Sequence, residues 1–493
     1  MSDEREYRIE KLEALRAAGI DPYPTRSERD HTAAEALERF DELQDTTITL
    51  AGRLMQLREM GKAAFAHIED GSGRIQIYIK RDVVGDEAFA LLKKLDLSDI
   101  IEATGTLFVT RTGEKTLNVE RYRLLAKSLA PLPAKGAEGA LKLSDDETRY
   151  RRRYLDLIAN RETELPIFVA RGKILAAMRD FLNARGFLEV ETPILQPLFG
   201  GASARPFVTH HNTLDRDLYL RIALELYLKR LIVGGIERVY EIGRNFRNEG
   251  IDRSHNPEFT MMELYQAYAD YEAMMHLVEE LYSYIAEKTL GSMKFSYLGV
   301  DLDLTPPWQR ISLREAIAGH AGIDFEQYPT RDELAKAMRA KGYEVDPKLG
   351  RGKLIDALQG VVVKGEGAKI KGPVFLYDYP VDLLPLAKRK PGAPDIVEAF
   401  QAYAGGLELG KAFTELNDPL DQRARFEDQA RQHAGGDEET QALDEDFIEA
   451  LEVGMPPTGG FGGGIDRLTM LLTDQSSIRE VILFPTLREQ RQD

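Results

Sequence analysis

Residues 46–133 constrain the fold of this 493-residue chain more than any other part of its sequence. Short apolar segments alternate there with turn signals such as Asp70-Gly71-Ser72-Gly73, as in "TTITLAGRLMQLREMGKAAFAHIEDGSGRIQIYIK". The later stretch "DIIEATGTLFVTRTGEKTLNVERYRLLAKS" continues the same pattern. About five short strands within roughly 90 residues predict a small closed barrel.

Among small closed barrels, the oligonucleotide-binding barrel is the leading candidate for this domain, although strands alone leave a purely structural barrel open. Before it, residues 1–45 form a predicted helical extension, because "IEKLEALRAAG" spaces its apolar residues as a helix does and stops at a glycine. After it, residues 134–150 are rich in Pro, Gly and Ala and are predicted to link the barrel to a second domain.

Residues 151–493 are predicted to form a larger α+β domain. The segment "FVARGKILAAMRDFLNARGF" is typical of an amphipathic helix that ends at Gly186, whereas "RVYEIGRNF" and "EFTMMELYQAYADY" are typical of strands. Strands and helices that mix without strict alternation favour a largely antiparallel sheet. Residues 310–372 are charged and helical in pattern, which indicates an insertion in this domain.

The bulk composition narrows the class of protein. Hydrophobic residues make up 43% of the chain and charged residues 30%, which is ordinary for a soluble globular protein. No run approaches the roughly 20 apolar residues of a membrane span, so no membrane association is expected. The absence of cysteine excludes disulfides and thiolate zinc sites and fits a cytoplasmic protein.

The charge balance bears on nucleic-acid binding. A formal net charge of −17 argues against wholesale binding of a phosphate backbone, although a local patch or a shape-reading module is enough to bind nucleic acid. The densest basic cluster is "RYRRRY", residues 149–154. A solvated helix start and a phosphate contact explain that cluster about equally well.

The stretch "FRNEGIDRSHNPEFTMME", residues 246–263, carries charges of both signs between two apolar segments. If those segments are antiparallel strands, the residues between them form a long turn at one end of a sheet. Side chains two apart in a strand share a face, so Arg247 and Glu249 are expected to lie together. An arginine forks onto phosphate or carboxylate oxygens, a nearby glutamate accepts from an amine, and His255 adds a donor for phosphate.

Two further stretches bring glycines and acids to places where a ligand can sit. In "GGFGGGIDRLTML", residues 459–471, glycines let the backbone approach a ligand, and Arg467 follows where a helix would begin. Taken alone, those glycines are better explained by tight packing, and their spacing matches neither a dinucleotide fingerprint nor a phosphate loop. In "GGLELGKAFTELND", Glu408 and Glu415 could hold magnesium or grip a cation, or they are solvated strand ends.

Taken together, these residues resemble the class II aminoacyl-tRNA synthetases, and more closely the lysyl-tRNA synthetases of class IIb in their bacterial form. The segment "GFLEVETPIL", with Pro193, is similar to the first motif of that family, "FRNE…HNPEFTMME" to the second and "GFGGGIDR" to the third. Other stretches that resemble lysyl enzymes are "THHN", "LYLKRL", "RNEGI", "AYADY", "ELND" and "DEDFIEALEVGMPPT". The resemblance covers the barrel, the linker and the large domain.

The resemblance implies a reaction in two steps. L-lysine is activated with ATP to lysyl-adenylate with release of pyrophosphate, and the lysyl group then passes to the 3′ end of tRNA(Lys) for translation. The substrate carboxylate is already a nucleophile, so the protein mainly positions the reactants and neutralises developing charge. The resemblance further implies Mg²⁺ as cofactor and a homodimer with Pro193 at its interface.

The same resemblance assigns roles to residues around ATP. Arg247 would hold the α-phosphate and the substrate carboxylate, Glu249 would accept from the adenine amine, and His255 would meet the outer phosphates. Phe259 would stack beneath adenine, with Arg467 above it as a flat cation. The implied catalytic residues are Arg247 and Arg467. The implied ATP-binding residues are Arg247, Glu249, His255, Asn256, Phe259, Glu408, Gly464 and Arg467.

An acidic pocket for the amino acid also follows from the resemblance. The implied lysine-binding residues are Gly201, Glu225, Arg247, Glu263, Tyr265, Phe413 and Glu415. A buried carboxylate needs a partner, so an acidic pocket suits a long cationic substrate. Aspartyl and asparaginyl enzymes share the fold and the barrel but need a cation or amide-reading groups in their pockets, which makes lysine the expected substrate.

Some positions depart from the lysyl pattern. Lys411 stands where that pattern has asparagine, and a fixed ammonium beside the substrate ammonium would cost on the order of 1–4 kcal/mol at about 4 Å. We expect Lys411 to point away or to pair with an acid, and changed specificity is the alternative. Gln401 stands where the family has a metal-ligating glutamate, so Gln401 and Glu408 are expected to form a weaker magnesium site or none. Leu224 and Gly463 are expected to be packing changes.

On the barrel, Arg58, Phe65 and Gln76 match positions with which class IIb enzymes read the anticodon. Stacking on an aromatic ring together with hydrogen bonds to base edges is how single-stranded RNA is usually recognised. Three other functions stay open. They are a synthetase of another class IIb specificity, a binding or regulatory paralogue that does not aminoacylate, and a ligase that lysylates a protein, although such ligases generally lack the barrel.

Overall fold

The computed structural model describes residues 2–133, 142–347, 349–365, 367–434 and 443–489. The chain divides into two compact units. The first comprises Met1–Ser144 with Ile158–Asn160, and the second comprises Asp145–Leu157 with Arg161–Asp493. Of the predicted linker, residues 134–141 lie outside the described residues. Across the described part of the chain, no helix combines the length and the apolar character needed to cross a membrane.

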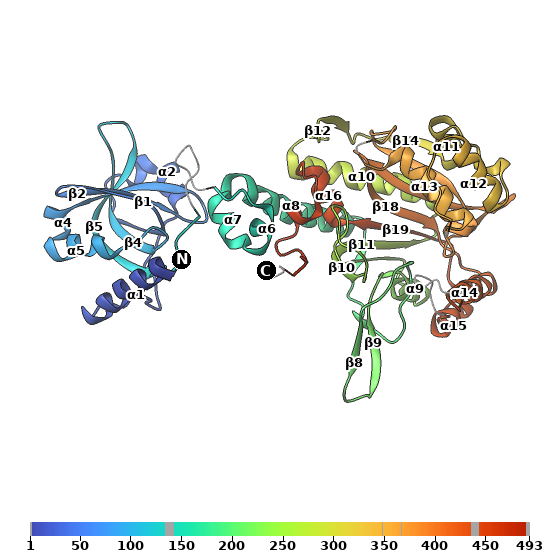
Figure 1. The fold of residues 1–493 in the computed structure, drawn as a ribbon, viewed down its shortest axis with the longest axis horizontal. Coiled ribbons are helices and arrows are strands. Elements are labelled where there is room, and N and C mark those ends of the chain that lie inside the picture. Colours follow the sequence, from blue (N-terminus) through green and yellow to red (C-terminus); the bar gives the residue numbers. More distant parts are fainter. Residues whose placement is uncertain (1, 134–141, 348, 366, 435–442, 490–493) are drawn as a thin grey trace. The chain divides into compact units, whose positions relative to one another are not determined.

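The first unit contains a closed five-stranded barrel (Figure 1). Its strands are β1 (Ile48–Met60), β2 (Ala63–Glu69), β3 (Arg74–Lys80), β4 (Ile100–Val109) and β5 (Lys115–Ala126), in the order β1-β2-β3-β5-β4. Its helices are α1 (Ser2–Ala17), α2 (Ala33–Glu38), α3 (Phe40–Leu43), α4 (Arg81–Val84), α5 (Asp86–Leu91) and the 3-10 turn η1 (Leu92–Lys94). The barrel predicted from the strand pattern is confirmed.

Strand alternation builds the barrel interior. Every second residue of β2 and β3 is buried, including Ile68 and Ile77, and the side chains between them lie on the outer surface. Gly105 permits the closest approach between two strands, because a Cβ there would lie 2.0 Å from the backbone oxygen of Asn118, where the register of β4 against β5 shifts.

A nine-stranded sheet is the platform of the second unit (Figure 1). Its order is β14-β15-β17-β18-β19-β11-β10-β6, with β16 paired to β17, and only β14–β15 and β10–β6 are parallel pairs. The strands are β6 (Leu188–Glu189), β10 (Arg238–Phe246), β11 (Glu258–Ala267), β14 (Gln309–Ser312), β15 (Val374–Pro380), β16 (Arg389–Lys390), β17 (Ala393–Ala404), β18 (Leu407–Thr414) and β19 (Thr458–Gly464). The α+β class with a mainly antiparallel sheet is confirmed.

Helices cover the two faces of this sheet differently. On one face, α8 (Arg161–Ala184), α10 (Tyr271–Leu290) and α16 (Ile465–Leu472) pack against alternate strand residues such as Met262, Phe400 and Phe461. On the other face, α11 (Leu313–Ala321), α12 (Arg331–Ala340) and α13 (Arg351–Val363) pack near β15 and β17. Near β10 and β11, the same face packs against α9 (Glu225–Val233) and α15 (Glu445–Gly454). Between these two groups of helices the face carries a cavity.

Smaller elements complete the second unit. They are α6 (Asp146–Arg151), α7 (Arg153–Ala159), β7 (Leu195–Gln196), β8 (Val208–His211), β9 (Arg216–Leu220), β12 (Lys294–Tyr297), β13 (Val300–Asp303), η2 (Phe325–Gln327), η3 (Val381–Leu383), α14 (Pro419–Ala434) and α17 (Ile478–Val481). Helices α11 to α13 fall in residues 310–372, the region of the predicted insertion, and α6 lies at the end of the predicted linker.

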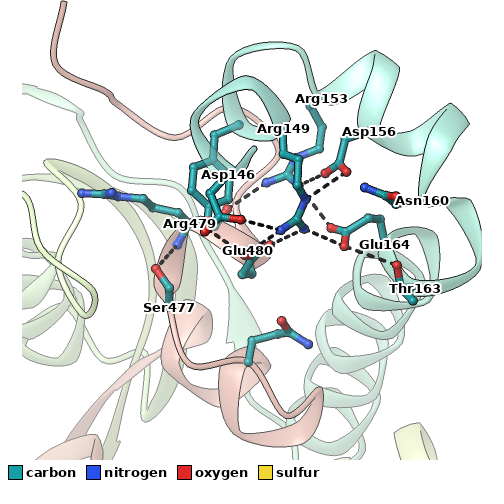
Figure 2. A network of polar contacts seen from close by, with 12 residues as sticks. Asp146, Arg149, Arg153, Asp156, Asn160, Thr163, Glu164, Ser477, Arg479 and Glu480 are labelled. Atoms are coloured by element: carbon teal, nitrogen blue, oxygen red, sulfur yellow. Dashed lines mark hydrogen bonds and ion pairs between the residues drawn. The ribbon is translucent and has the colours of Figure 1, made fainter. Parts of the chain in front are cut away.

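The basic cluster at residues 149–154 is mainly an internal ion-pair network (Figure 2). The guanidinium of Arg153 is fully buried and lies 2.6 Å from the Asp156 carboxylate and 3.2 Å from that of Glu164. Arg149 pairs with the same two acids and with Glu480 of α17, at 3.0 Å. The two explanations drawn from sequence, a solvated helix start and a phosphate contact, are both wrong for Arg149 and Arg153, because buried acids of the protein itself occupy their guanidinium groups.

Replacing Arg153 by methionine is expected to lower the free energy of unfolding of the second unit by about 3–5 kcal/mol, because Asp156 and Glu164 would lose a buried partner. Urea unfolding of the full chain measures the change. Arg152→Met, at an exposed neighbour, is the matched control and should shift the free energy by no more than about 0.5 kcal/mol. Equal effects of the two substitutions would contradict the assignment.

Candidate functional site

A cavity of about 400 Å³ lies on the sheet face between the two groups of helices. Its floor is formed by β11, β19 and β18, and the loop between β10 and β11 forms one wall. All the residues that the family resemblance implied for ATP and lysine binding line this cavity: Gly201, Glu225, Arg247, Glu249, His255, Asn256, Phe259, Glu263, Tyr265, Glu408, Phe413, Glu415, Gly464 and Arg467. Residues drawn from distant parts of the chain therefore share one enclosure.

The loop between β10 and β11 is closed by its own backbone and by one acid. The amide of Arg247 donates to the Pro257 carbonyl at 2.8 Å, which holds the two strand ends together. Asp252 accepts from the backbone amides of Ser254 at 2.6 Å and His255 at 2.8 Å. These contacts fix where the Arg247 and His255 side chains leave the backbone.

Two glycines of β19 serve different purposes. A Cβ at Gly460 would lie 2.1 Å from the Glu415 carboxylate and 2.6 Å from the Tyr265 ring, so this glycine makes room for the protein itself. A Cβ at Gly462 would meet nothing closer than the Glu263 Cγ at 3.4 Å, an ordinary contact, and Gly462 also lines the cavity. The stretch had two explanations, tight packing and close approach of a ligand. Packing explains Gly460, and Gly462 leaves space for a ligand.

One end of the cavity is an acid pocket with an internal cation. Glu225, Glu263 and Glu415 are all buried, and so is Lys229, one helical turn after Glu225 on α9. The Lys229 ammonium lies 2.5 Å from a Glu225 oxygen and also pairs with Glu415. Glu263 accepts from the Leu224 amide at 3.1 Å. Sequence reasoning missed Lys229, although its spacing of four from Glu225 is the signal of a helical ion pair.

Burial governs the ionisation of these acids. Burial and the nearby charge of Glu225 raise the pKa of Glu263 to about 7. Burial also raises the pKa of Glu415, an effect that Lys229 opposes and Glu225 increases. Lys229 thus pairs with two of the three carboxyl groups, and Glu263 has the Leu224 amide and the Tyr265 hydroxyl instead of a cation, so the acids of the pocket outnumber its internal ammonium. Such a pocket suits a ligand that brings an ammonium group.

The other end of the cavity gathers cations. The Arg247 guanidinium lies 5.1 Å from the centroid of the Phe259 ring, and Arg467 donates to the Glu408 carbonyl at 3.4 Å. Arg467 also lies 3.2 Å from Nε2 of His255, whose Nδ1 lies 2.8 Å from Asp252. Two arginines at one end suit a ligand rich in phosphate oxygens.

The two residues proposed from sequence as metal ligands have different surroundings. Burial raises the pKa of Glu408, but Arg467 and Lys411 outweigh it and hold that pKa below its usual value, so a carboxylate faces the cavity. The Gln401 amide oxygen accepts instead from Nε2 of Gln359 at 2.5 Å and from the Tyr403 hydroxyl at 2.6 Å, off the cavity wall. Across the described residues, no group of three His, Cys, Asp or Glu side chains is placed to hold a metal. The Glu408 carboxylate is therefore suited to bind magnesium, and the Gln401 amide is not.

Lys411 faces the cavity by strand alternation with Phe413 and Glu415, and a strand irregularity brings Glu408 to the same face. Alternation alone would put Glu408 and Lys411 on opposite faces, but an extra residue at Leu409 shifts the register against β17 and brings both to the cavity side. Lys411 therefore does not point away from the cavity, and within the described residues it has no ion-pair partner. The expectation that it turns outward or pairs with an acid is wrong.

The predicted anticodon residues lie together on the outer surface of the barrel. Arg58 of β1 is opposite Phe65 of β2, and the Phe65 ring stacks on Tyr78 of β3 at 4.5 Å and 23°. The Gln76 amide donates to Glu114 at 2.7 Å. Tyr78 and Glu114 escaped sequence reasoning, although Tyr78 follows Gln76 by two residues in a strand and therefore shares its face.

Comparison with known proteins relates both units to translation. Residues 145–488 match the family described as "tRNA synthetases class II (D, K and N)", and residues 48–125 match "OB-fold nucleic acid binding domain". A protein of Chloroflexus aurantiacus named lysine--tRNA ligase is 56% identical over 493 residues, covering 99% of each chain. Proteins of the same name from Moorella thermoacetica and a Roseiflexus species are 53% and 55% identical, covering 97% or more of each chain.

The raised pKa of Glu263 makes stability depend on pH. In the unfolded chain this carboxyl titrates near its ordinary value of 4.5, but the folded state keeps the proton up to about pH 7. Its contribution to stability is therefore complete at acid pH and is lost as pH rises towards 7. Between pH 4.5 and pH 8, the unfolding free energy of the ligand-free protein should fall by about 3 kcal/mol relative to Glu263→Gln. Parallel urea-unfolding profiles for the two proteins would contradict the shift.

Proposed function

This chain belongs to the family of tRNA synthetases class II (D, K and N), and from that membership we infer that it is a lysine–tRNA ligase. It activates L-lysine with ATP, releases pyrophosphate and transfers the lysyl group to the 3′ end of tRNA(Lys). One observation supports lysine within this family: the buried pocket holds the three acids Glu225, Glu263 and Glu415, and its internal ammonium, that of Lys229, pairs with only two of them. An aspartate or asparagine side chain brings no positive charge to such a pocket.

The chemistry needs charge neutralisation more than proton transfer. In the first step a lysine carboxylate oxygen bonds to the α-phosphorus of ATP while the bond to pyrophosphate breaks. In the second, the tRNA 3′ hydroxyl loses its proton and bonds to the lysyl carbonyl carbon, and AMP leaves. Arg247 holds the carboxylate and the α-phosphate, and Arg467 covers adenine above Phe259. These roles are supported by the position of Arg247, Phe259 and Arg467 on the wall of one cavity, where the Arg247 guanidinium lies over the Phe259 ring.

The remaining roles are assigned to other residues that line the cavity. Glu249 and Asn256 complete the ATP site, His255 meets the outer phosphates, and Gly464 leaves room beside Arg467. Glu408 is the residue that would hold Mg²⁺, and a bound Mg²⁺ neutralises polyphosphate charge. Gly201 and Phe413 line the lysine end with Tyr265. These roles are supported by the lining of the cavity and by the carboxylate state of Glu408.

A homodimer is proposed from apolar side chains exposed to solvent. Leu188, Ile194, Leu195 and Leu198 surround Pro193 and are 39–52% exposed. So many large apolar side chains within one short segment indicate a covered surface, and a second copy of the chain is the partner that the family implies. Because the reaction serves translation, we place the enzyme in the cytoplasm.

Arg247→Ala is expected to lower the rate of lysine-dependent ATP–pyrophosphate exchange by about 10²–10³, because a preorganised cation at the reacting phosphate is lost. The same exchange assay with lysine, aspartate and asparagine tests the function, and the wild type should respond to lysine alone. Response to another amino acid would identify another class IIb specificity, and no response would indicate a paralogue that does not aminoacylate. Exchange with lysine but no charging of tRNA(Lys) would favour a ligase that lysylates protein.

Phe65→Ala is expected to weaken charging of tRNA(Lys) while leaving lysine-dependent exchange unchanged, because the half-buried Phe65 and Tyr78 rings offer a stacking surface worth about 1–3 kcal/mol per base. The measurement compares the two assays on one enzyme preparation. Equal losses in both assays would refute the assignment of anticodon reading to Arg58, Phe65 and Gln76.

A further inference from the structure

Lys411 of β18 brings an unpaired positive charge to the cavity wall. Its cross-strand neighbours, Gln401 on β17 and Gly462 on β19, carry no charge. Among the residues that the structure describes, no carboxylate lies within ion-pair distance of its ammonium, although the positive charge of Lys411 lowers the pKa of Glu408. The Lys411 ammonium is therefore available to an anion bound in the cavity.

The register of the sheet fixes the place of Lys411 along the cavity. One row of residues across three strands contains Lys411, Gly462 and Glu263. Farther along β18 in one direction lies Glu415, which belongs to the acid pocket, and in the other direction lies Glu408, which contacts Arg467. Lys411 is level with Glu263 of the acid pocket, two strands away, but its charge acts on Glu408, so its ammonium lies at the boundary between the end that suits an ammonium and the end that suits phosphate.

Distances along the strand separate Lys411 from the substrate ammonium. Four residues of strand place Glu415 about 13 Å from Lys411 along β18. An extended lysine spans roughly 7–8 Å from its carboxylate to its ammonium, by the lengths of its covalent bonds. The reaction requires the carboxylate to face the end that suits phosphate, so with the substrate ammonium in the acid pocket the carboxylate lies towards Lys411. The repulsion expected from sequence becomes an attraction between opposite charges.

We propose that Lys411 is a catalytic residue of the first step, whose ammonium binds the lysine carboxylate and the α-phosphate of ATP. The inference rests on the proposed function and names an additional cation for it. As the carboxylate oxygen bonds to the α-phosphorus and the bond to pyrophosphate breaks, negative charge moves onto the phosphate oxygens. The ammonium keeps its proton throughout and stabilises this charge from the side opposite to the β10–β11 loop, which carries Arg247. Gln401 offers no carboxylate to hold a metal ion that would neutralise phosphate charge. Lys411 supplies positive charge in its place.

Kinetics test the catalytic role. Lys411→Met is expected to lower kcat for lysine-dependent exchange by a factor on the order of 10², and Lys411→Arg should restore most of the rate. Lys364→Met is the matched control, since the charge of Lys364 also reaches Glu408 but its side chain is 40% exposed and lies off the cavity wall. The control should leave kcat unchanged. Equal rates for the wild type and Lys411→Met would overturn the proposal.

Binding without ATP tests where the ammonium points. Calorimetry compares lysine with 1,5-diaminopentane, which is lysine without its carboxylate. In Lys411→Met the Kd for lysine should rise about tenfold, the loss of one charge-assisted contact, while the Kd for the diamine should stay unchanged or fall. Tighter binding of both ligands would place Lys411 beside the substrate ammonium and overturn the proposal. A wild type without lysine-dependent exchange would refute the function instead, and the two Kd values would still decide the position of Lys411.

Discussion

The ion pairs of Lys229 with Glu225 and Glu415 are the interaction on which the site depends. Three carboxyl groups buried beside one another would repel and would lose hydration that costs several kcal/mol per ion. Lys229 offsets part of that cost from inside the protein, and the raised pKa of Glu263 shows the part that remains. The protein can therefore fold with these acids buried, although the pocket holds fewer positive charges than carboxyl groups. A substrate ammonium supplies what is missing, so recognition and stabilisation are the same interaction.

The antiparallel sheet turns this local chemistry into an ordered site. Because alternate residues of β11, β18 and β19 face the same side, one face presents acids, glycines and cations in successive rows while the other packs on α8, α10 and α16. The irregularity at Leu409 is the exception that brings Glu408 and Lys411 to one face.

Much of this arrangement could be predicted from the sequence, and what could not has physical causes. The barrel, the antiparallel platform and the residues that line the cavity follow from periodic patterns and from three motifs in family order. The burial of Arg149 and Arg153 could not be predicted, because Glu480, a partner of Arg149, and the carbonyls of Arg479 and Leu483, which accept from Arg153, lie more than 300 residues away in the chain. Gln401 accepts hydrogen bonds from Gln359, on another element, and from Tyr403, and the orientation of Glu408 beside Lys411 depends on an extra strand residue that alternation does not reveal.

The network of Arg149, Arg153 and Glu480 also bears on the order in which the protein is made. The ribosome delivers both arginines roughly 330 residues before Glu480 emerges, whereas all five barrel strands are complete by residue 126. The first unit can thus fold during synthesis from its own residues. In the second, Arg149 lacks Glu480 and Arg153 lacks the carbonyls of Arg479 and Leu483 until translation is nearly finished, so α17 and the residues just after it complete the contacts of both guanidinium groups.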